Sequence, residues 1–329
     1  MTSPFFSFVR PLAVVAFGGN ALLRPGDPGT TAGQLARARE AVRNLLPILG
    51  RGFEMIVVHG NGPQVGNLLL QAEIAAERIP PQTLDFCVAQ TQGSLGFLLE
   101  LAFADELPRA GFRKEVVTFL TQVEVDAADP AFLAPSKPIG PYFSAERAAW
   151  LMETHGWAMV EDAGRGWRKV VASPKPRSIR GVPVAARLVN GGHIVIAAGG
   201  GGIPVVVPEE GEVRGVEAVI DKDYAAAMLA GQLKADLFVI LTGVERVMRD
   251  FGRPTETPLP EIDVETARRM LAEGQFPPGN MGPKIDAAIR YVEGGGRQVL
   301  ITRAESLDAA LDGKTGTLIR NPKRAGFVS

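Results

Sequence analysis

Three lysines lie next to segments whose backbone is expected to bind anions. Lys222 stands between Asp221 and Asp223, where an apolar extended segment meets an alanine-rich helical segment. The first N–H groups of a helix are unpaired and the dipole is positive there, so an anion is favoured. A lysine at this point suits phosphate binding. From this segment alone, a solvated lysine in the first turn of a surface helix is an equal alternative.

Lys284 repeats this arrangement in a second helix. It follows Pro283, and proline suits the first position of a helix, so we expect Lys284 in the first turn, where its charge opposes the dipole and needs a compensating anion. Two such lysines indicate one bound polyphosphate. Lys137, close to Gly140, is a third basic residue beside glycine, but its case is weaker, because on its own a surface loop explains it better.

The two acids beside Lys222 have different expected roles. Asp221 precedes the predicted helix and is expected to cap it. Asp223 is the better candidate for holding the lysines in position. Either carboxylate could also bind Mg²⁺, directly or through water.

Four glycine-rich turns follow predicted strands: Gly18-Gly19-Asn20, Gly60-Asn61-Gly62, Gly199 to Gly202, and Thr242-Gly243. The carboxyl ends of parallel strands meet at one edge of a sheet, where ligands bind. Glycines there let the backbone approach a ligand and aim N–H groups at an anion. A single turn of this kind is usually only a tight turn, but four at equivalent points favour an anion-binding crevice.

The elements that must position these turns alternate between strand and helix, which predicts an α/β protein with a parallel sheet covered on both faces. The predicted strands are 12–17, 53–58, 115–120, 193–197, 203–207, 237–241, 299–302 and 315–319, and the predicted helices are 32–49, 64–76, 84–106, 144–154, 183–190, 264–273 and 283–293. Between Pro130 and Pro183 the texture changes to prolines and short strand-like pieces, which we interpret as a small lid or subdomain.

Several other functions are disfavoured. The chain has no Walker A sequence, no G-x-G-x-x-G after its first strand and no G-x-S-x-G, and its three histidines share no metal-binding spacing, so all three are expected to be structural. Thirty-five basic residues against 36 acidic ones give no bulk charge for nucleic acid or an anionic membrane. Cys87 is a lone cysteine expected in the core, and no apolar run is long enough to span a membrane. A cytoplasmic enzyme is the expectation.

Longer motifs contain the turns and lysines just described. They are Phe17-Gly18-Gly19-Asn20-Ala21-Leu22, His59-Gly60-Asn61-Gly62-Pro63-Gln64-Val65-Gly66-Asn67, Lys137-Pro138-Ile139-Gly140-Pro141, Glu161 to Gly166, Ser173-Pro174-Lys175-Pro176, Gly199 to Pro204, Val219 to Asp223, Leu241 to Val244, and Met281-Gly282-Pro283-Lys284. In this order they resemble the carbamate kinases of the amino acid kinase superfamily, over nearly the whole chain. Phe17, Ala172 and Asn280 depart from the residues usual in that family, and none of them is a proposed catalytic group.

The resemblance implies a three-layer αβα sandwich whose open, mainly parallel sheet has about eight strands. It implies a single domain over residues 1–329, with a protruding lid subdomain at about residues 137–180, and a homodimer. The implied reaction is ATP + carbamate ⇌ ADP + carbamoyl phosphate with Mg²⁺, used to make ATP in catabolism.

The resemblance and the glycine turns together give a set of predicted site residues. The expected catalytic residues are Lys137, Lys222, Lys284, Asp223, Asn20 and Asn61. Gly18, Gly19, Gly60, Gly62, Gly200 and Gly201 are expected to bind substrate, and Thr242, Gly243, Val244, Met281 and Gly282 to bind nucleotide. No side chain is assigned as a direct metal ligand.

Carbamate is already an anionic oxygen nucleophile, so its phosphorylation needs alignment and charge neutralisation but no general base. Two alternatives remain open. A kinase acting on a related carboxylate, such as N-acetylglutamate, would need a cationic clamp, expected to be an arginine, that the sequence does not locate. A regulator that binds nucleotide or carbamoyl phosphate without turnover is disfavoured by the three lysines.

Overall fold

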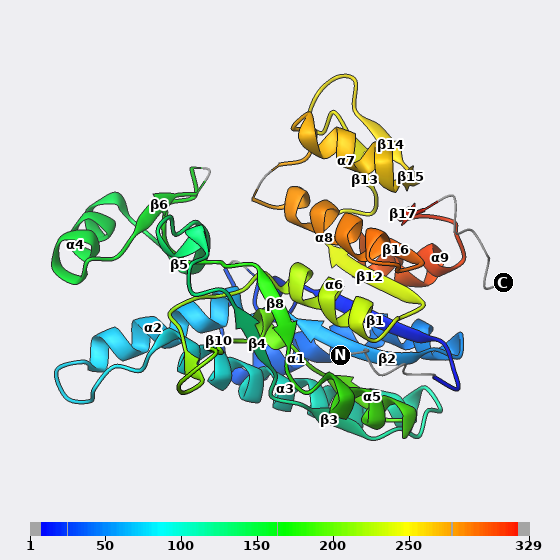
Figure 1. Ribbon diagram of the computed structural model, residues 1–329, viewed down its shortest axis with the longest axis horizontal. Coiled ribbons are helices and arrows are strands. Elements are labelled where there is room, and N and C mark those ends of the chain that lie inside the picture. The colour runs from blue at the N-terminus through cyan, green and yellow to red at the C-terminus, as the bar shows by residue number, and fades with distance from the viewer. Residues whose placement is uncertain (1–7, 25, 163, 278, 322–329) are drawn as a thin grey trace.

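An eight-stranded sheet forms the centre of the computed structural model, which describes residues 8–24, 26–162, 164–277 and 279–321 (Figure 1). In sheet order the strands are β15 (Glu261–Asp263), β17 (Thr317–Arg320), β16 (Gln298–Arg303), β12 (Leu237–Thr242), β1 (Leu12–Phe17), β2 (Glu54–His59), β9 (Ile194–Ile196) and β3 (Val116–Thr118). All neighbours are parallel except β16 and β17. The predicted mainly parallel sheet is confirmed.

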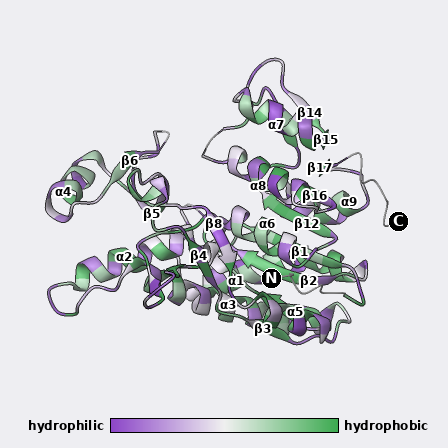
Figure 2. Cartoon of the chain, in the orientation of Figure 1, coloured by the Kyte–Doolittle hydropathy of each residue, from purple (hydrophilic) through white to green (hydrophobic). Residues whose placement is uncertain are grey.

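Helices cover both faces of this sheet, which confirms the three-layer sandwich. On one face lie α1 (Thr31–Gly50), α3 (Leu84–Arg109) and α9 (Leu307–Leu311), and on the other α5 (Val182–Asn190), α6 (Lys222–Gln232), α7 (Val264–Ala272) and α8 (Met281–Glu293). Alternate residues of β1 belong to the two core layers: Val14 lies in the same buried cluster as residues of α6, and Val15 in the same cluster as residues of α1. A strand covered on both faces has no polar side, which explains its unbroken apolar run (Figure 2).

Two smaller sheets extend from the sandwich. The four-stranded sheet has the order β11 (Arg214–Gly215), β10 (Ile203–Val206), β4 (Gln122–Val125) and β8 (Pro176–Ile179). The three-stranded sheet has the order β5 (Lys137–Phe143), β7 (Trp167–Val171) and β6 (Met159–Glu161), with α4 (Ala145–His155) packed against it. A hairpin of β13 (Val247–Arg249) and β14 (Thr257–Leu259) completes the strands among the described residues.

We call β5, α4, β6 and β7 the protruding unit, residues 137–171, because they project from the sandwich beside α2 (Gly62–Ala75) in Figure 1. A Cβ atom added to Gly66 of α2 would lie 1.9 Å from the Cα of Gly140 in β5, so the two backbones touch there. β8 falls within the predicted lid of residues 137–180 but belongs to the four-stranded sheet. Position 163 and both ends of the predicted domain 1–329 lie outside the described residues.

The start of α8 differs from the prediction. Pro283 is the third residue of the helix and not its first, because α8 begins at Met281. Proline is tolerated throughout a first turn, where the N–H groups lack partners within the helix, so its presence did not fix the register. Lys284 is consequently the fourth residue, at the end of the first turn.

Two further predictions concern burial and membranes. Cys87 is buried in α3, as expected for a core residue. No helix in the described part of the chain is long and apolar enough to cross a bilayer.

Candidate active site

The four glycine-rich turns lie at the carboxyl ends of four neighbouring parallel strands, β12, β1, β2 and β9. Two of the contacts between turns require glycine. A Cβ at Gly60 would lie 2.5 Å from the backbone nitrogen of Gly19, and one at Gly200, whose φ is +68°, would lie 2.2 Å from Nδ2 of Asn61. The glycines therefore let adjacent turns pack directly on each other.

A cavity of about 220 Å³ opens above three of these turns, those that follow β1, β2 and β9, and the fourth, Thr242-Gly243, does not line it. Among the predicted site residues it is lined by Gly18, Gly19, Asn20, Gly60, Asn61, Gly62, Lys137, Gly200, Lys222, Asp223 and Lys284. Gly201, Thr242, Gly243, Val244, Met281 and Gly282 do not line it. Gly201 instead packs against the carbonyl of Ile220. The structure thus gathers all six predicted catalytic residues, while the nucleotide-binding role of the remaining group stays a prediction.

Asp223 joins the two helix-start lysines. Its Oδ1 accepts a hydrogen bond from Nζ of Lys222 at 2.9 Å, and its Oδ2 accepts one from Nζ of Lys284 at 2.8 Å. Asp223 is buried, with 1% exposed. It is the second residue of α6, whereas Lys284 lies in α8, so this carboxylate fixes one helix start relative to the other.

Asp221 accepts two hydrogen bonds, one that caps α6 and one from a lysine of the protruding unit. Its Oδ1 accepts from the backbone N–H of Asp223 at 2.8 Å, which makes it the N-cap of α6, as predicted. Its Oδ2 accepts from Nζ of Lys137 at 2.9 Å. Lys137 begins the protruding unit, so this ion pair connects the unit to the start of α6.

The charges in this network perturb one another. Burial tends to raise the pKa of the Asp223 carboxyl, but the charges of Lys222 and Lys284 hold that pKa below its usual value. Burial tends to lower the pKa of Lys222, yet the two neighbouring aspartates raise it above its usual value. The pKa of Lys284 is lowered, first by burial and then by the charge of Lys222. Burial also tends to raise the pKa of Asp221, but the charges of Lys137 and Lys222 hold it below its usual value, so both aspartates are anions.

The cavity as a whole favours an anionic ligand. Its lining contains four basic side chains, Lys137, Arg168, Lys222 and Lys284, against the two acidic ones, Asp221 and Asp223. Two helix N-termini, those of α6 and α8, add positive potential. A phosphate-bearing ligand would compensate this excess.

Arg168 was not among the predicted site residues. It lies in β7, two residues beyond the motif Glu161 to Gly166. The sequence offered one hint, a basic residue soon after a glycine-rich turn. Arg168 reaches the cavity, however, only through the folding of the protruding unit. Asn61 is positioned by Thr91, also absent from the prediction, through a hydrogen bond of 2.8 Å from Nδ2 to Oγ1.

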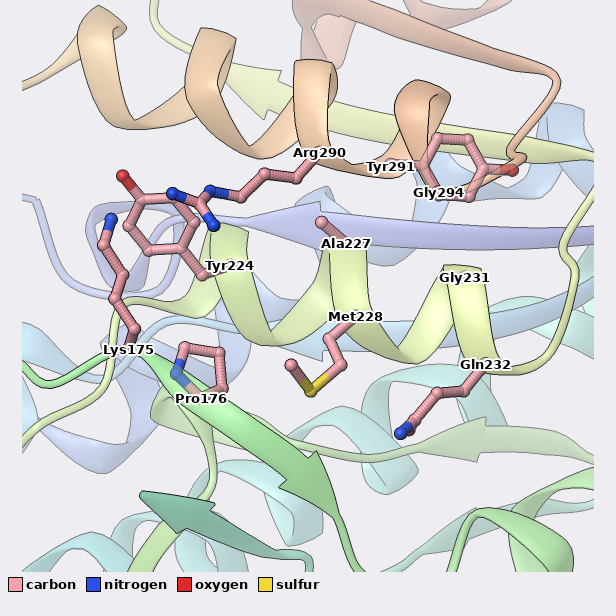
Figure 3. Close-up of a pocket in the computed structure, with 10 residues that line it drawn as sticks. All are labelled: Lys175, Pro176, Tyr224, Ala227, Met228, Gly231, Gln232, Arg290, Tyr291 and Gly294. Carbon is pink, nitrogen blue, oxygen red and sulfur yellow. The ribbon is translucent and has the colours of Figure 1, made fainter. Parts of the chain in front are cut away.

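A hydrogen bond behind the lysines ties α6 to α8 a second time. Tyr224, two residues after Lys222, donates from its hydroxyl to Oδ2 of Asp286, two residues after Lys284, at 2.7 Å. Figure 3 shows Lys175 and Arg290 beside the Tyr224 ring, at one end of a cavity of about 320 Å³ that runs between the two helices. The hydrogen bond between Tyr224 and Asp286 thus helps to fix the distance between Lys222 in α6 and Lys284 in α8.

His59 is fully buried, and its Nδ1 lies 3.1 Å from the Gly60 carbonyl oxygen. Burial lowers its pKa to about 4, so the imidazole is neutral at pH 7. Among the described residues, no group of three or more His, Cys, Asp or Glu side chains is arranged to hold a metal ion. The structural role of His59 stays a prediction.

Comparison with known proteins identifies the architecture. The sequence model of the Amino acid kinase family matches residues 11–303. This chain belongs to the amino acid kinase family. It is 46% identical to the carbamate kinase of Thermococcus kodakarensis over 309 residues, which cover 93% of this chain and 98% of that protein. It is 45% identical to the carbamate kinase of Pyrococcus furiosus, with the same coverage of both chains.

Two solved structures share this architecture. Carbamate kinase from Giardia lamblia bound to AMP-PNP superposes with a TM-score of 0.87 at 36% identity, covering 95% of this chain and 99% of that one. An N-acetylglutamate synthase from Neisseria gonorrhoeae shares the fold at 18% identity and a TM-score of 0.52. The resemblance to carbamate kinases is therefore confirmed, and the likeness to the synthase concerns the fold alone.

Proposed function

We propose that this amino acid kinase is a carbamate kinase, which transfers a phosphoryl group reversibly between ATP and carbamate. The observation that carries the proposal is the pair Lys222 and Lys284, joined by buried Asp223 in the wall of the glycine-rich cavity. Relatives that are named carbamate kinases and are 44–46% identical over nearly their full length support the choice of substrate.

In the mechanism that we propose, a carbamate oxygen attacks the γ-phosphorus of ATP, and the bond from that phosphorus to the β,γ-bridging oxygen breaks. The products are carbamoyl phosphate and ADP, and no proton has to move. Lys222 and Lys284 neutralise charge on the transferred group, while Lys137, Asn20 and Asn61 orient the acceptor. The absence of a general base from this scheme suits a cavity lined by lysines, amides and glycines.

Mg²⁺ enters this proposal as part of the nucleotide substrate. Kinases that use ATP generally require a divalent ion, which bridges and neutralises phosphate oxygens. Asp221 and Asp223 both line the cavity, but each is already engaged by lysine. Phosphate oxygens and water therefore fit better as the ligands of the ion than these two carboxylates do.

A related carboxylate kinase is the second candidate. Arg168 and an adjoining cavity of about 250 Å³ are the features that would suit an acceptor with a second carboxylate. The nearly full-length likeness to carbamate kinases favours the smaller substrate.

A coupled assay for ATP formed from ADP, with carbamoyl phosphate, acetyl phosphate and N-acetylglutamyl phosphate as donors, separates the candidates. We expect the highest kcat/KM with carbamoyl phosphate. No ATP from that donor would refute the main proposal, and preference for N-acetylglutamyl phosphate would favour the second. A binding protein without turnover would produce ATP from none of them.

We also propose that the protein is cytoplasmic, that it makes ATP from carbamoyl phosphate in catabolism, and that the protruding unit acts as a lid.

We propose further that the protein is a homodimer, because three large apolar side chains of α3 are exposed. Phe86, Phe97 and Leu101 leave 62%, 59% and 38% of their surface exposed. Their spacings of eleven and four residues put them on one face of the helix, which a partner subunit would cover. Sedimentation at micromolar concentration tests the dimer, and a monomer there would contradict it.

A further inference from the structure

Arg168 lies in the wall between two cavities. Its side chain, in β7 of the protruding unit, is only 16% exposed. It lines both the active-site cavity and the adjoining cavity of about 250 Å³, and Asn20 and Pro63 are the other two residues shared by these linings. Lys222 and Lys284 line the first cavity but not the second. Arg168 therefore marks the end of the active site at Asn20, where the acceptor is expected.

The guanidinium of Arg168 is held in place but incompletely paired. Its Nη2 donates to the carbonyl oxygen of Gly140 at 3.0 Å, while its Nη1 lies 3.5 Å from Oδ2 of Asp162. Asp162 also accepts a shorter bond, 2.8 Å, from Arg165. Within the described residues, Nε of Arg168 is buried without a hydrogen-bond partner. The contact from Nη1 to Asp162 is long, so this end of the guanidinium has no strong partner, and an anion in the neighbouring cavities would complete its bonding.

The other cations of the cavity are more closely paired with carboxylates than Arg168 is. Lys222 and Lys284 share Asp223, and Lys137 is paired with Asp221, all at 2.8–2.9 Å. The longer contact of Arg168 leaves more of its charge available to a ligand. A guanidinium also presents a planar fork of donors, which matches carboxylate and phosphate oxygens in two-point hydrogen bonding.

We propose that Arg168 binds the oxygens of the small substrate at the acceptor end, which are those of the carbamate carboxylate and of the carbamoyl group that it becomes in carbamoyl phosphate. The protruding unit then supplies two cations to the acceptor end of the site, Lys137 from β5 and Arg168 from β7. This inference rests on the proposed function for the identity of the substrate. The anion-binding role itself depends only on the burial, the pairing and the position of Arg168.

The test compares Arg168→Gln with Arg168→Lys and with Arg165→Gln. Arg165 shares the Asp162 partner but is 59% exposed and lines neither cavity, so it is a matched control. We expect Arg168→Gln to raise KM for carbamoyl phosphate by at least about 30-fold, with KM for ADP changed less than about twofold. Arg168→Lys should recover part of the loss, because it restores charge but not the fork. Arg165→Gln should match the wild type.

Calorimetric binding of inorganic phosphate without nucleotide separates this inference from the proposed function. If the wild type makes no ATP from carbamoyl phosphate, the proposed function fails, yet weaker phosphate binding by Arg168→Gln still supports the anion-binding role. Equal phosphate binding by wild type and Arg168→Gln overturns that role. An unchanged KM for carbamoyl phosphate, or equal rises in both KM values with a lowered Tm, also overturns it.

Discussion

The two halves of the active site are built differently. The half on the sandwich places Lys222 and Lys284 at the starts of two packed helices and joins them twice, through Asp223 and through Tyr224 with Asp286. The half on the protruding unit brings Lys137 and Arg168 from a small sheet that packs on α2, where Gly66 meets Gly140 and Val65 shares a buried cluster with Ile139. A fixed distance between Lys222 and Lys284 suits the neutralisation of charge in the transition state. Cations on a unit that projects from the sandwich suit the binding of a small substrate.

Removal of a lysine from the sandwich half should have the largest effect on catalysis. We expect Lys222→Ala or Lys284→Ala to lower kcat by about 10²–10³-fold, roughly 3–4 kcal/mol, because a charge that stabilises the transferred phosphoryl group is lost. Asp223 keeps one lysine partner in either variant, so the fold should survive. Steady-state kinetics and the Tm measure both effects.

Lys314→Ala is the control for those substitutions, because Lys314 is 72% exposed and pairs with Asp312 at the surface. It should leave both kcat and the Tm near the wild-type values. Near-wild-type turnover in Lys222→Ala or Lys284→Ala would remove the proposed role of that lysine.

Gly66→Ala tests whether the packing of β5 on α2 positions the substrate-binding residues of the protruding unit. The new methyl would lie 1.9 Å from the Cα of Gly140, whose carbonyl holds Arg168, so β5 must move. Overpacking of this kind costs about 1–3 kcal/mol, and we expect KM for carbamoyl phosphate to rise about tenfold with KM for ADP unchanged. Gly50→Ala, which meets no atom within 4 Å, is the control. A lower kcat with both KM values unchanged would show that the protruding half contributes to phosphoryl transfer and not to binding of the small substrate.

Tyr224→Phe should change the kinetics only slightly. It removes the hydrogen bond to Asp286, about 1 kcal/mol, and should lower kcat about fivefold without changing KM for carbamoyl phosphate. Tyr142→Phe is the matching change in the protruding unit, where the hydroxyl lies 3.3 Å from Oδ2 of Asp162. There we expect a higher KM for carbamoyl phosphate and an unchanged kcat. The same kinetic pattern in both variants would contradict the division into halves.

Local patterns in the sequence were enough to predict the sandwich. Runs such as Leu12–Phe17 are apolar throughout because each strand is covered on both faces, and glycine turns mark the strand ends. The lysines were also predictable, because a basic residue in a first helical turn conflicts with the helix dipole and so indicates a ligand. The start of α8 was wrong by two residues, since proline is tolerated at several first-turn positions.

Local periodicity and local charge are thus enough to predict the fold class and the basic residues nearest to helix starts. The pairing of those charges depends on contacts between distant parts of the chain. Asp223 meets Lys284 across 61 residues and Lys137 meets Asp221 across 84, and no local pattern encodes such contacts. The same holds for Arg168, an ordinary strand residue in the sequence, whose importance comes from the packing of β5 on α2 and from what that packing leaves unpaired.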